Sequence, residues 1–256
     1  APTGKITRKH RVFFTEKNAL LIDKYRHFIE TAKYPKKYRC YLLAQLLVKS
    51  SIHNNTNGQF SAFYKDGGGI GKFGGKKEID VKRITKDIIL EMPILVPNKC
   101  DVMVSQLDIL DWVENIPPVD IMYLDPPYNK HPYSIYYFLL DIINNWDTTQ
   151  DIPPVDISYR GQPKTWVKSS YNSLKYAEKE FEKLISMTKA KFIVISYNNK
   201  GIIPPKRLEE MLKRNGTVYK HELEHKTYNK LKGIAKYKRT TPTENVSEYI
   251  WVLDKR

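Results

Sequence analysis

The most constraining feature of the sequence is an apolar segment that ends abruptly in an acid. VDIMYL, at 119–124, is followed directly by Asp125, Pro126, Pro127 and Tyr128. A short apolar run bounded by turn residues is typical of a buried strand. Because open α/β sheets bind ligands at the carboxyl ends of their strands, this acid lies where a functional group is expected. The alternative is that the prolines only end the strand and Asp125 takes part in the turn.

The chain beyond Pro97 alternates between strand and helix patterns. We expect strands at 100–108, 119–124, 191–197, 217–226 and 247–253. We expect helices at 108–116, 134–146, 173–188 and 204–216. Buried strands that alternate with helices predict an α/β fold, with a mostly parallel sheet covered by helices on both faces.

The chain before Pro97 has a different character. Helical spacing of apolar residues predicts helices at 15–33 and 37–50, followed by an Asn-, Gly- and Lys-rich region at 50–77 around a short extended segment. The glycine cluster at 67–75 does not follow a buried strand, so we do not interpret it as a phosphate-cradling loop. A flexible basic loop that touches a DNA backbone is favoured over a disordered surface loop. We therefore divide the chain into a helical and loop region, 11–97, and an α/β region, 98–256.

The charge of the chain indicates a polyanionic partner. Its 256 residues include 43 Lys and Arg against 28 Asp and Glu, a formal net charge of +15. Such a surplus attracts nucleic acid, although a merely soluble basic surface is the alternative. The residues expected to contact phosphates are Lys72, Lys76, Lys77, Lys230, Lys232 and Lys236.

Two further features of the composition bear on location and chemistry. No apolar run is long enough to span a bilayer and no signal peptide is evident, which predicts a cytoplasmic protein. Cys40 and Cys100 are too few and too isolated for a disulfide framework or a zinc site. We expect both cysteines to be reduced and structural, and we expect no metal.

Asp125-Pro126-Pro127-Tyr128 resembles the catalytic motif of adenine-specific DNA methyltransferases. The similarity extends to other blocks in the same order, among them FFTEKNALLIDKYRHFIE, YLDPPYNKHPYSIYYFLLDII and KFIVISYNNKGII, and covers most of the chain from 11 to 255. The resemblance implies a Rossmann-like methyltransferase fold, S-adenosylmethionine as the cofactor, and duplex DNA as the substrate. It also implies base flipping and a place in a restriction-modification system of a bacterium or phage. On this resemblance, 11–97 is expected to be the DNA target-recognition region and 98–256 the catalytic methyltransferase core. The cognate restriction endonuclease is then a genetic partner only.

The chemistry of adenine methylation explains the residue types of this motif. The exocyclic amino group is a poor nucleophile because its lone pair is conjugated with the ring. The Asp125 carboxylate and the Pro126 carbonyl can accept its two protons, Pro127 adds no competing donor, and Tyr128 offers a face for stacking. Methyl transfer is then a direct displacement at the sulfonium, which involves no covalent intermediate and no cysteine nucleophile.

The resemblance also assigns residues to the cofactor. It implies that Asp108 accepts a hydrogen bond from the cofactor's adenine and that Ile109 packs on that ring. Asp125 is the third residue expected to contribute to cofactor binding. The alternative for Asp108 is an N-cap of the helix that follows it.

One block of the resembled family is missing. We find no strand ending in the glycine loop that wraps the methionine part of the cofactor. We expect that the sequence is a fragment or that a second chain carries this loop; loss of cofactor binding is the third possibility. The missing loop leaves a catalytically silent DNA- or RNA-binding subunit as one alternative function. An RNA or protein-glutamine methyltransferase is another, because related Pro-Pro-Tyr motifs serve those amino groups too. A nuclease built on Glu224 and Lys226 is the weakest of them.

Overall fold

The computed structural model describes residues 4–75, 78–97, 99–146, 166–226 and 245–256. The chain divides into two compact units. Of the described residues, the first unit comprises 4–75, 78–97, 133–146 and Trp166, and the second comprises 99–132, 167–226 and 245–256. The sequence-based division includes 133–146 in the catalytic core, whereas the structure groups these residues with the first unit. The roles assigned to 11–97 and 98–256, target recognition and catalysis, stay predictions.

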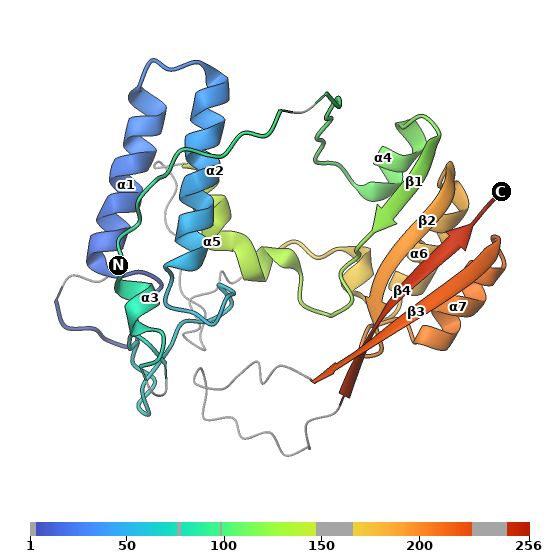
Figure 1. Cartoon of the computed structure of the whole chain (residues 1–256). Coiled ribbons are helices and arrows are strands. Elements are labelled where there is room, and N and C mark those ends of the chain that lie inside the picture. Colours follow the sequence, from blue (N-terminus) through green and yellow to red (C-terminus); the bar gives the residue numbers. More distant parts are fainter. Residues whose placement is uncertain (1–3, 76–77, 98, 147–165, 227–244) are drawn as a thin grey trace. The chain divides into compact units, whose positions relative to one another are not determined.

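Among its described residues, the first unit contains four helices (Figure 1). They are α1 (Glu16–Thr31), α2 (Lys36–Ile52), α3 (Val81–Thr85) and α5 (Tyr133–Asn145). The Thr15 hydroxyl accepts a hydrogen bond from the Asn18 backbone N–H at 3.2 Å, which is the interaction of an N-cap. The helices predicted at 15–33 and 37–50 are thus confirmed with small shifts at their ends. Across the described residues, no helix has the length and hydropathy that crossing a bilayer requires.

Aromatic rings form the centre of the first unit's core. The ring of Phe13 lies 5.8 Å from Phe60, 5.2 Å from Phe63 and 5.9 Å from Phe138, measured between ring centroids. Tilted and edge-on contacts at these distances are favourable for aromatic pairs. Phe138 belongs to α5. Its burial among these rings explains why a helix from the middle of the sequence joins the first unit.

Side-chain hydrogen bonds anchor the described part of the Asn- and Gly-rich region. The Asn55 amide donates to the carbonyl oxygens of Val12 at 2.8 Å and Lys72 at 2.9 Å, and its oxygen accepts from the Gly74 N–H. The Arg83 guanidinium donates to the carbonyls of Asn54 and Thr56. The prediction of a flexible loop is wrong for this part, because buried amides satisfy its backbone groups. The extended segment expected here forms only an isolated bridge, between Lys65 and Gly71.

A four-stranded sheet organises the second unit. Its strands are β1 (Val119–Leu124), β2 (Ala190–Asn198), β3 (Thr217–Lys226) and β4 (Asn245–Asp254), in the order β1-β2-β4-β3. β1 and β2 run parallel, whereas β4 is antiparallel to both β2 and β3. The α/β class and these four strands are confirmed. The described sheet is mixed rather than mostly parallel, because only β1 and β2 are joined through the helical crossover that parallel neighbours require.

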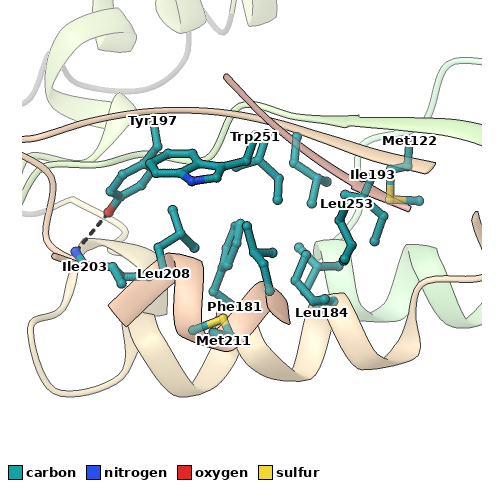
Figure 2. Close-up of a cluster of buried hydrophobic side chains, with 14 of the residues drawn as sticks. Met122, Phe181, Leu184, Ile193, Tyr197, Ile203, Leu208, Met211, Trp251 and Leu253 are labelled. Atoms are coloured by element: carbon teal, nitrogen blue, oxygen red, sulfur yellow. Dashed lines mark hydrogen bonds between the residues drawn. The ribbon is translucent and has the colours of Figure 1, made fainter. Parts of the chain in front are cut away.

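Two helices cover one face of this sheet. From α6 (Ala177–Met187) and α7 (Pro205–Lys213), Phe181, Leu184, Leu208 and Met211 pack toward Trp251, Ile193 and Leu253 (Figure 2). The predicted helix at 173–188 starts later than expected, after a 3-10 turn at Ser170–Asn172. β1 is not fully buried as predicted, since Met122 and Leu124 face the core while Ile121 is 63% exposed. Alternation along the strand leaves its second face open.

The strand predicted at 100–108 does not form. Residues 101–106 have no regular structure, and Val102, Met103 and Val104 are exposed. A strand needs a neighbour that completes its hydrogen bonds, and no described strand lies beside this segment. α4 (Ile109–Asn115) begins directly after it. The strand prediction is wrong here, because the pairing that decides strand formation is absent among the described residues.

Replacing Phe181 by alanine tests the packing of the sheet against α6. We expect Phe181→Ala to lower the free energy of unfolding by about 3–5 kcal/mol, because it leaves a cavity under a closely packed sheet. Ile121→Ala, on the open side of β1, is the matched control and is expected to change stability little. Urea unfolding followed by tryptophan fluorescence measures both variants, and equal losses would contradict this packing.

Candidate active site

Asp125 lies at the edge of the sheet where the two parallel strands end. β1 pairs with β2 in register from Val119↔Ala190 to Leu124↔Ile195, so Asp125 and the end of β2 reach the same edge. The Asp125 side chain is exposed. Within the described part of the chain, no hydrogen bond or ion pair engages its carboxylate or the Pro126 carbonyl. Both acceptors that the sequence singled out are therefore open to a ligand.

The loop that follows Asp125 is held by its backbone. The Tyr128 carbonyl accepts a hydrogen bond from the Ile202 N–H at 3.0 Å. The side-chain amide of Asn172 donates to the carbonyls of Asn129 at 2.8 Å and His131 at 3.4 Å. These contacts fix the loop from two other segments of the second unit. Asp125 thus makes no contribution to holding the turn, and its interpretation as a turn residue finds no support in these contacts.

Tyr128 is half-buried against a second tyrosine. Its ring lies 5.9 Å from the Tyr197 ring at an interplanar angle of 75°, an edge-on pair. The Tyr197 hydroxyl accepts from the Ile203 N–H at 3.1 Å, a bond drawn in Figure 2. Burial raises the pKa of the Tyr128 phenol, and the negative charges of Glu248 and Asp125 raise it further. Tyr128 is therefore a neutral, oriented aromatic group beside Asp125.

A second carboxylate, Glu248 on β4, lies close to this group. It is paired in register with Asn198, the last residue of β2, whose amide donates to its Oε1 at 3.4 Å. The Asn198 oxygen accepts from the Lys200 N–H at 3.0 Å. Sequence reasoning missed Asn172, Tyr197, Asn198 and Glu248. The polar run SYNN at the end of a predicted parallel strand was the available signal for Asn198, whereas the pairing with Glu248 has no local signature.

Asp108 caps α4 in the structure. Its Oδ1 accepts from the Leu110 N–H at 2.9 Å, as the N-cap alternative predicted. Ile109 is partly buried and packs on the core of the second unit. The cofactor role of Asp108 and Ile109 stays a prediction. The cap uses one carboxylate oxygen and leaves the other in an exposed position.

The structure describes only one of the lysines expected to bind DNA. Lys72 is partly exposed and forms an ion pair with Glu78 at 3.0 Å. The other five, Lys76, Lys77, Lys230, Lys232 and Lys236, lie outside the described residues. Their contacts with phosphate stay predictions.

The glycine cluster has a packing role. A Cβ at Gly71 would lie 2.3 Å from the Val12 side chain, and one at Gly75 would lie 3.0 Å from the Tyr64 ring. Gly75 also has a φ of 71°, a backbone conformation that favours glycine. Close approach to Val12 and Tyr64 is reason enough for glycine at both positions.

Within the described residues, neither Cys40 nor Cys100 is part of a disulfide, and both side chains are exposed. The expectation that they are structural is wrong, because neither side chain is packed in a core. Among the described residues, no cluster of three or more His, Cys, Asp or Glu is arranged to hold a metal ion.

Comparisons with known proteins match most of the chain. Residues 5–211 match the family model of the D12 class N6 adenine-specific DNA methyltransferases. The type II methyltransferase M.NlaIII of Neisseria lactamica is 29% identical over 254 residues, 96% of this chain and 68% of the relative. The modification methylase LlaI of Lactococcus lactis subsp. lactis is 29% identical over 233 residues, 87% of this chain and 34% of the relative. The type II methyltransferase M.CviAII of Paramecium bursaria Chlorella virus 1 is 28% identical over 214 residues, 82% and 58% of the two chains.

These matches confirm the resemblance that the sequence blocks indicated, and with it the methyltransferase α/β fold. The chain spans between about a third and two thirds of the length of these relatives. No solved structure shows significant similarity to it.

Replacing Glu248 by glutamine tests the electrostatics of the site. We expect the pKa of Tyr128 to fall in Glu248→Gln, since removal of a nearby negative charge makes loss of the phenolic proton easier. NMR titration of ring-labelled tyrosine measures it, with Tyr128→Phe to assign the signal among 18 tyrosines. The control is Glu182→Gln, on α6, where Glu182 pairs with Arg214. It should leave the pKa of Tyr128 unchanged. An unchanged Tyr128 titration in Glu248→Gln would contradict this arrangement.

Proposed function

Since the chain belongs to the D12 class of N6 adenine-specific DNA methyltransferases, we propose that it holds the target adenine during methyl transfer from S-adenosylmethionine to duplex DNA. The observation that carries the proposal is the pair of open acceptors, the Asp125 carboxylate and the Pro126 carbonyl, beside the oriented ring of Tyr128. The names of the relatives support a site-specific modification enzyme of a restriction-modification system. Such an enzyme acts on the genome in the cytoplasm of a bacterium or of a phage-infected cell.

The acceptor geometry addresses the weak nucleophilicity of the adenine amino group. With one N6 proton on the Asp125 carboxylate and the other on the Pro126 carbonyl, the nitrogen becomes more pyramidal and its lone pair is freed for attack. The base reaches these groups only when it is flipped out of the duplex, at a cost of a few kcal/mol. Stacking on Tyr128 offsets part of that cost. The proton that N6 loses after transfer passes to the Asp125 carboxylate or to water.

The residues of this chain fit one end of the cofactor. S-adenosylmethionine supplies an electrophilic methyl group on a sulfonium. The Asp108 oxygen that the helix cap leaves unused can accept from its adenine amino group, while Ile109 lies next to it in the chain for contact with the ring. For the methionine end we propose a glycine loop on a further segment or on a second chain. The relatives' greater length supports the existence of such a segment.

Replacing Asp125 by alanine tests the proposal. We expect the intact protein to transfer a labelled methyl group from S-adenosylmethionine to duplex DNA, and we expect Asp125→Ala to reduce transfer at least about a hundredfold, as loss of one preorganised polar contact does. DNA retardation in a gel should persist, because the charge that binds phosphates is unchanged. Asp120→Ala, an exposed acid paired with Lys191 at the other end of β1, is the matched control.

Two results would contradict the proposal. Full transfer by Asp125→Ala would remove the role of the acid. DNA binding without any transfer by the intact protein would favour the catalytically silent subunit instead. Sequencing of methylated DNA from cells that express the intact protein identifies the target sequence.

A further inference from the structure

The turn between α1 and α2 carries an unbalanced positive charge. No Asp or Glu occurs from 31 to 65, whereas four cations lie within seven residues: Lys33, Lys36, Lys37 and Arg39. The nearest acid along the chain, Glu30, already pairs with Arg26 at 2.6 Å and with Arg39 at 3.8 Å. In the described chain, the three lysines are exposed and have no ion pair. We call residues 33–41 the hairpin tip.

Arg39 stabilises the turn at the hairpin tip. Its Nε donates to the Ile29 carbonyl at 2.8 Å, and its Nη2 donates to the Glu30 carbonyl. These carbonyls belong to the last turn of α1, whose oxygens lack partners within the helix. The bonds tie the start of α2 to the end of α1. Lys33, Lys36 and Lys37 are not needed to hold the turn.

Two of these lysines oppose the stability of α2. Lys36 and Lys37 occupy its first turn, which contains no acid, and the preceding Pro35 makes no side-chain cap. The helix dipole places partial positive charge at this end, so lysines here are unfavourable and acids would stabilise. The positive charge at this position therefore costs stability. The stability of the fold therefore does not explain why lysines occupy these two positions.

Exposed aromatic side chains accompany the lysines. Tyr34 is 53% exposed and Tyr38 is 46% exposed. The ring of Tyr38 lies 6.5 Å from that of Tyr41, and the Lys37 ammonium lies 5.0 Å from the Tyr38 ring centroid. Tyrosine hydroxyls and lysine ammonium groups are both common donors to DNA phosphates. The tip thus combines charge, donors and apolar rings on one exposed element.

We propose that the hairpin tip, through Lys33, Lys36, Lys37 and Tyr38, binds the phosphate backbone of duplex DNA. This contact is independent of base sequence, and it increases the affinity for DNA beyond what binding of the flipped adenine provides. It rests on the proposed function for the identity of the polyanion. Phosphate contacts of this kind fix the position of a protein on the duplex, while base contacts elsewhere read the sequence.

A salt series on a neutralised tip tests the contact. The variant Lys33→Gln/Lys36→Gln/Lys37→Gln is compared with Lys179→Gln/Lys183→Gln/Lys206→Gln, which removes the same charge from exposed positions on α6 and α7. Binding to a fluorescein-labelled duplex is measured by anisotropy. Each lost phosphate contact lowers the slope of log K against log salt by about 0.9, so the tip variant is expected to lose up to about 2.7. The control variant is expected to keep the wild-type slope.

A second variant separates binding from folding. Lys36→Glu/Lys37→Glu complements the helix dipole, so we expect its thermal unfolding midpoint to rise while its DNA affinity falls more than tenfold. A fall in both quantities would mean that the lysines serve the fold, and it would overturn the proposal. Tyr38→Ala is expected to weaken DNA binding with the salt slope unchanged.

Three other results would overturn the proposal. They are equal salt slopes for the tip and control variants, no DNA binding by the intact protein, and tip-dependent binding to anionic phospholipid vesicles with unchanged DNA binding. A parallel assay of methyl transfer by the wild-type protein distinguishes failure of this contact from failure of the proposed function. If the tip variant has a reduced salt slope but the wild type transfers no methyl group, the DNA contact is supported and the proposed enzymatic function is rejected. If methyl transfer is normal and the salt slope is unchanged, only the DNA contact of the tip is rejected.

Discussion

The parallel pairing of β1 with β2 is the interaction on which the candidate site depends. It brings the end of each strand to one edge of the sheet, so that Asp125 and Asn198 lie there although 73 residues separate them in the sequence. The core beneath the sheet, with Phe181 and Trp251 fully buried, holds both strands in register. Any loss of this packing would displace the acid and its surroundings together.

The loop after Asp125 shows how the site keeps its acid available. Hydrogen bonds from Ile202 and Asn172 hold the loop backbone, and Tyr197 supports the ring of Tyr128. Backbone carbonyls and neighbouring side chains therefore hold the loop in place. Within the described residues, the Asp125 carboxylate and the Pro126 carbonyl have no hydrogen-bond partner, which the proposed methylation of an amino group requires.

Local patterns predicted most elements of this fold, and non-local pairing explains the failures. The strand VDIMYL and the N-cap alternative for Asp108 are recognisable from a few adjacent residues, and both form in the structure. The strand expected at 100–108 and the fully buried β1 depended on neighbours that no local pattern reveals. Asn172 and Glu248 could not be predicted as site residues for the same reason, because tertiary contacts and strand register bring them to the site. Charge alone predicts a phosphate contact for Lys72, whereas in the structure Lys72 pairs with Glu78, six residues further along the chain.

The central claim is that Asp125 and Pro126 together hold the amino group of the flipped adenine. The most direct test is a crystal structure of the intact enzyme with S-adenosylhomocysteine and a duplex that contains its target sequence. We predict that adenine N6 lies within hydrogen-bond distance, about 3.2 Å or less, of both the Asp125 carboxylate and the Pro126 carbonyl. An adenine that remains stacked in the duplex, or an N6 that contacts neither oxygen, would contradict the account.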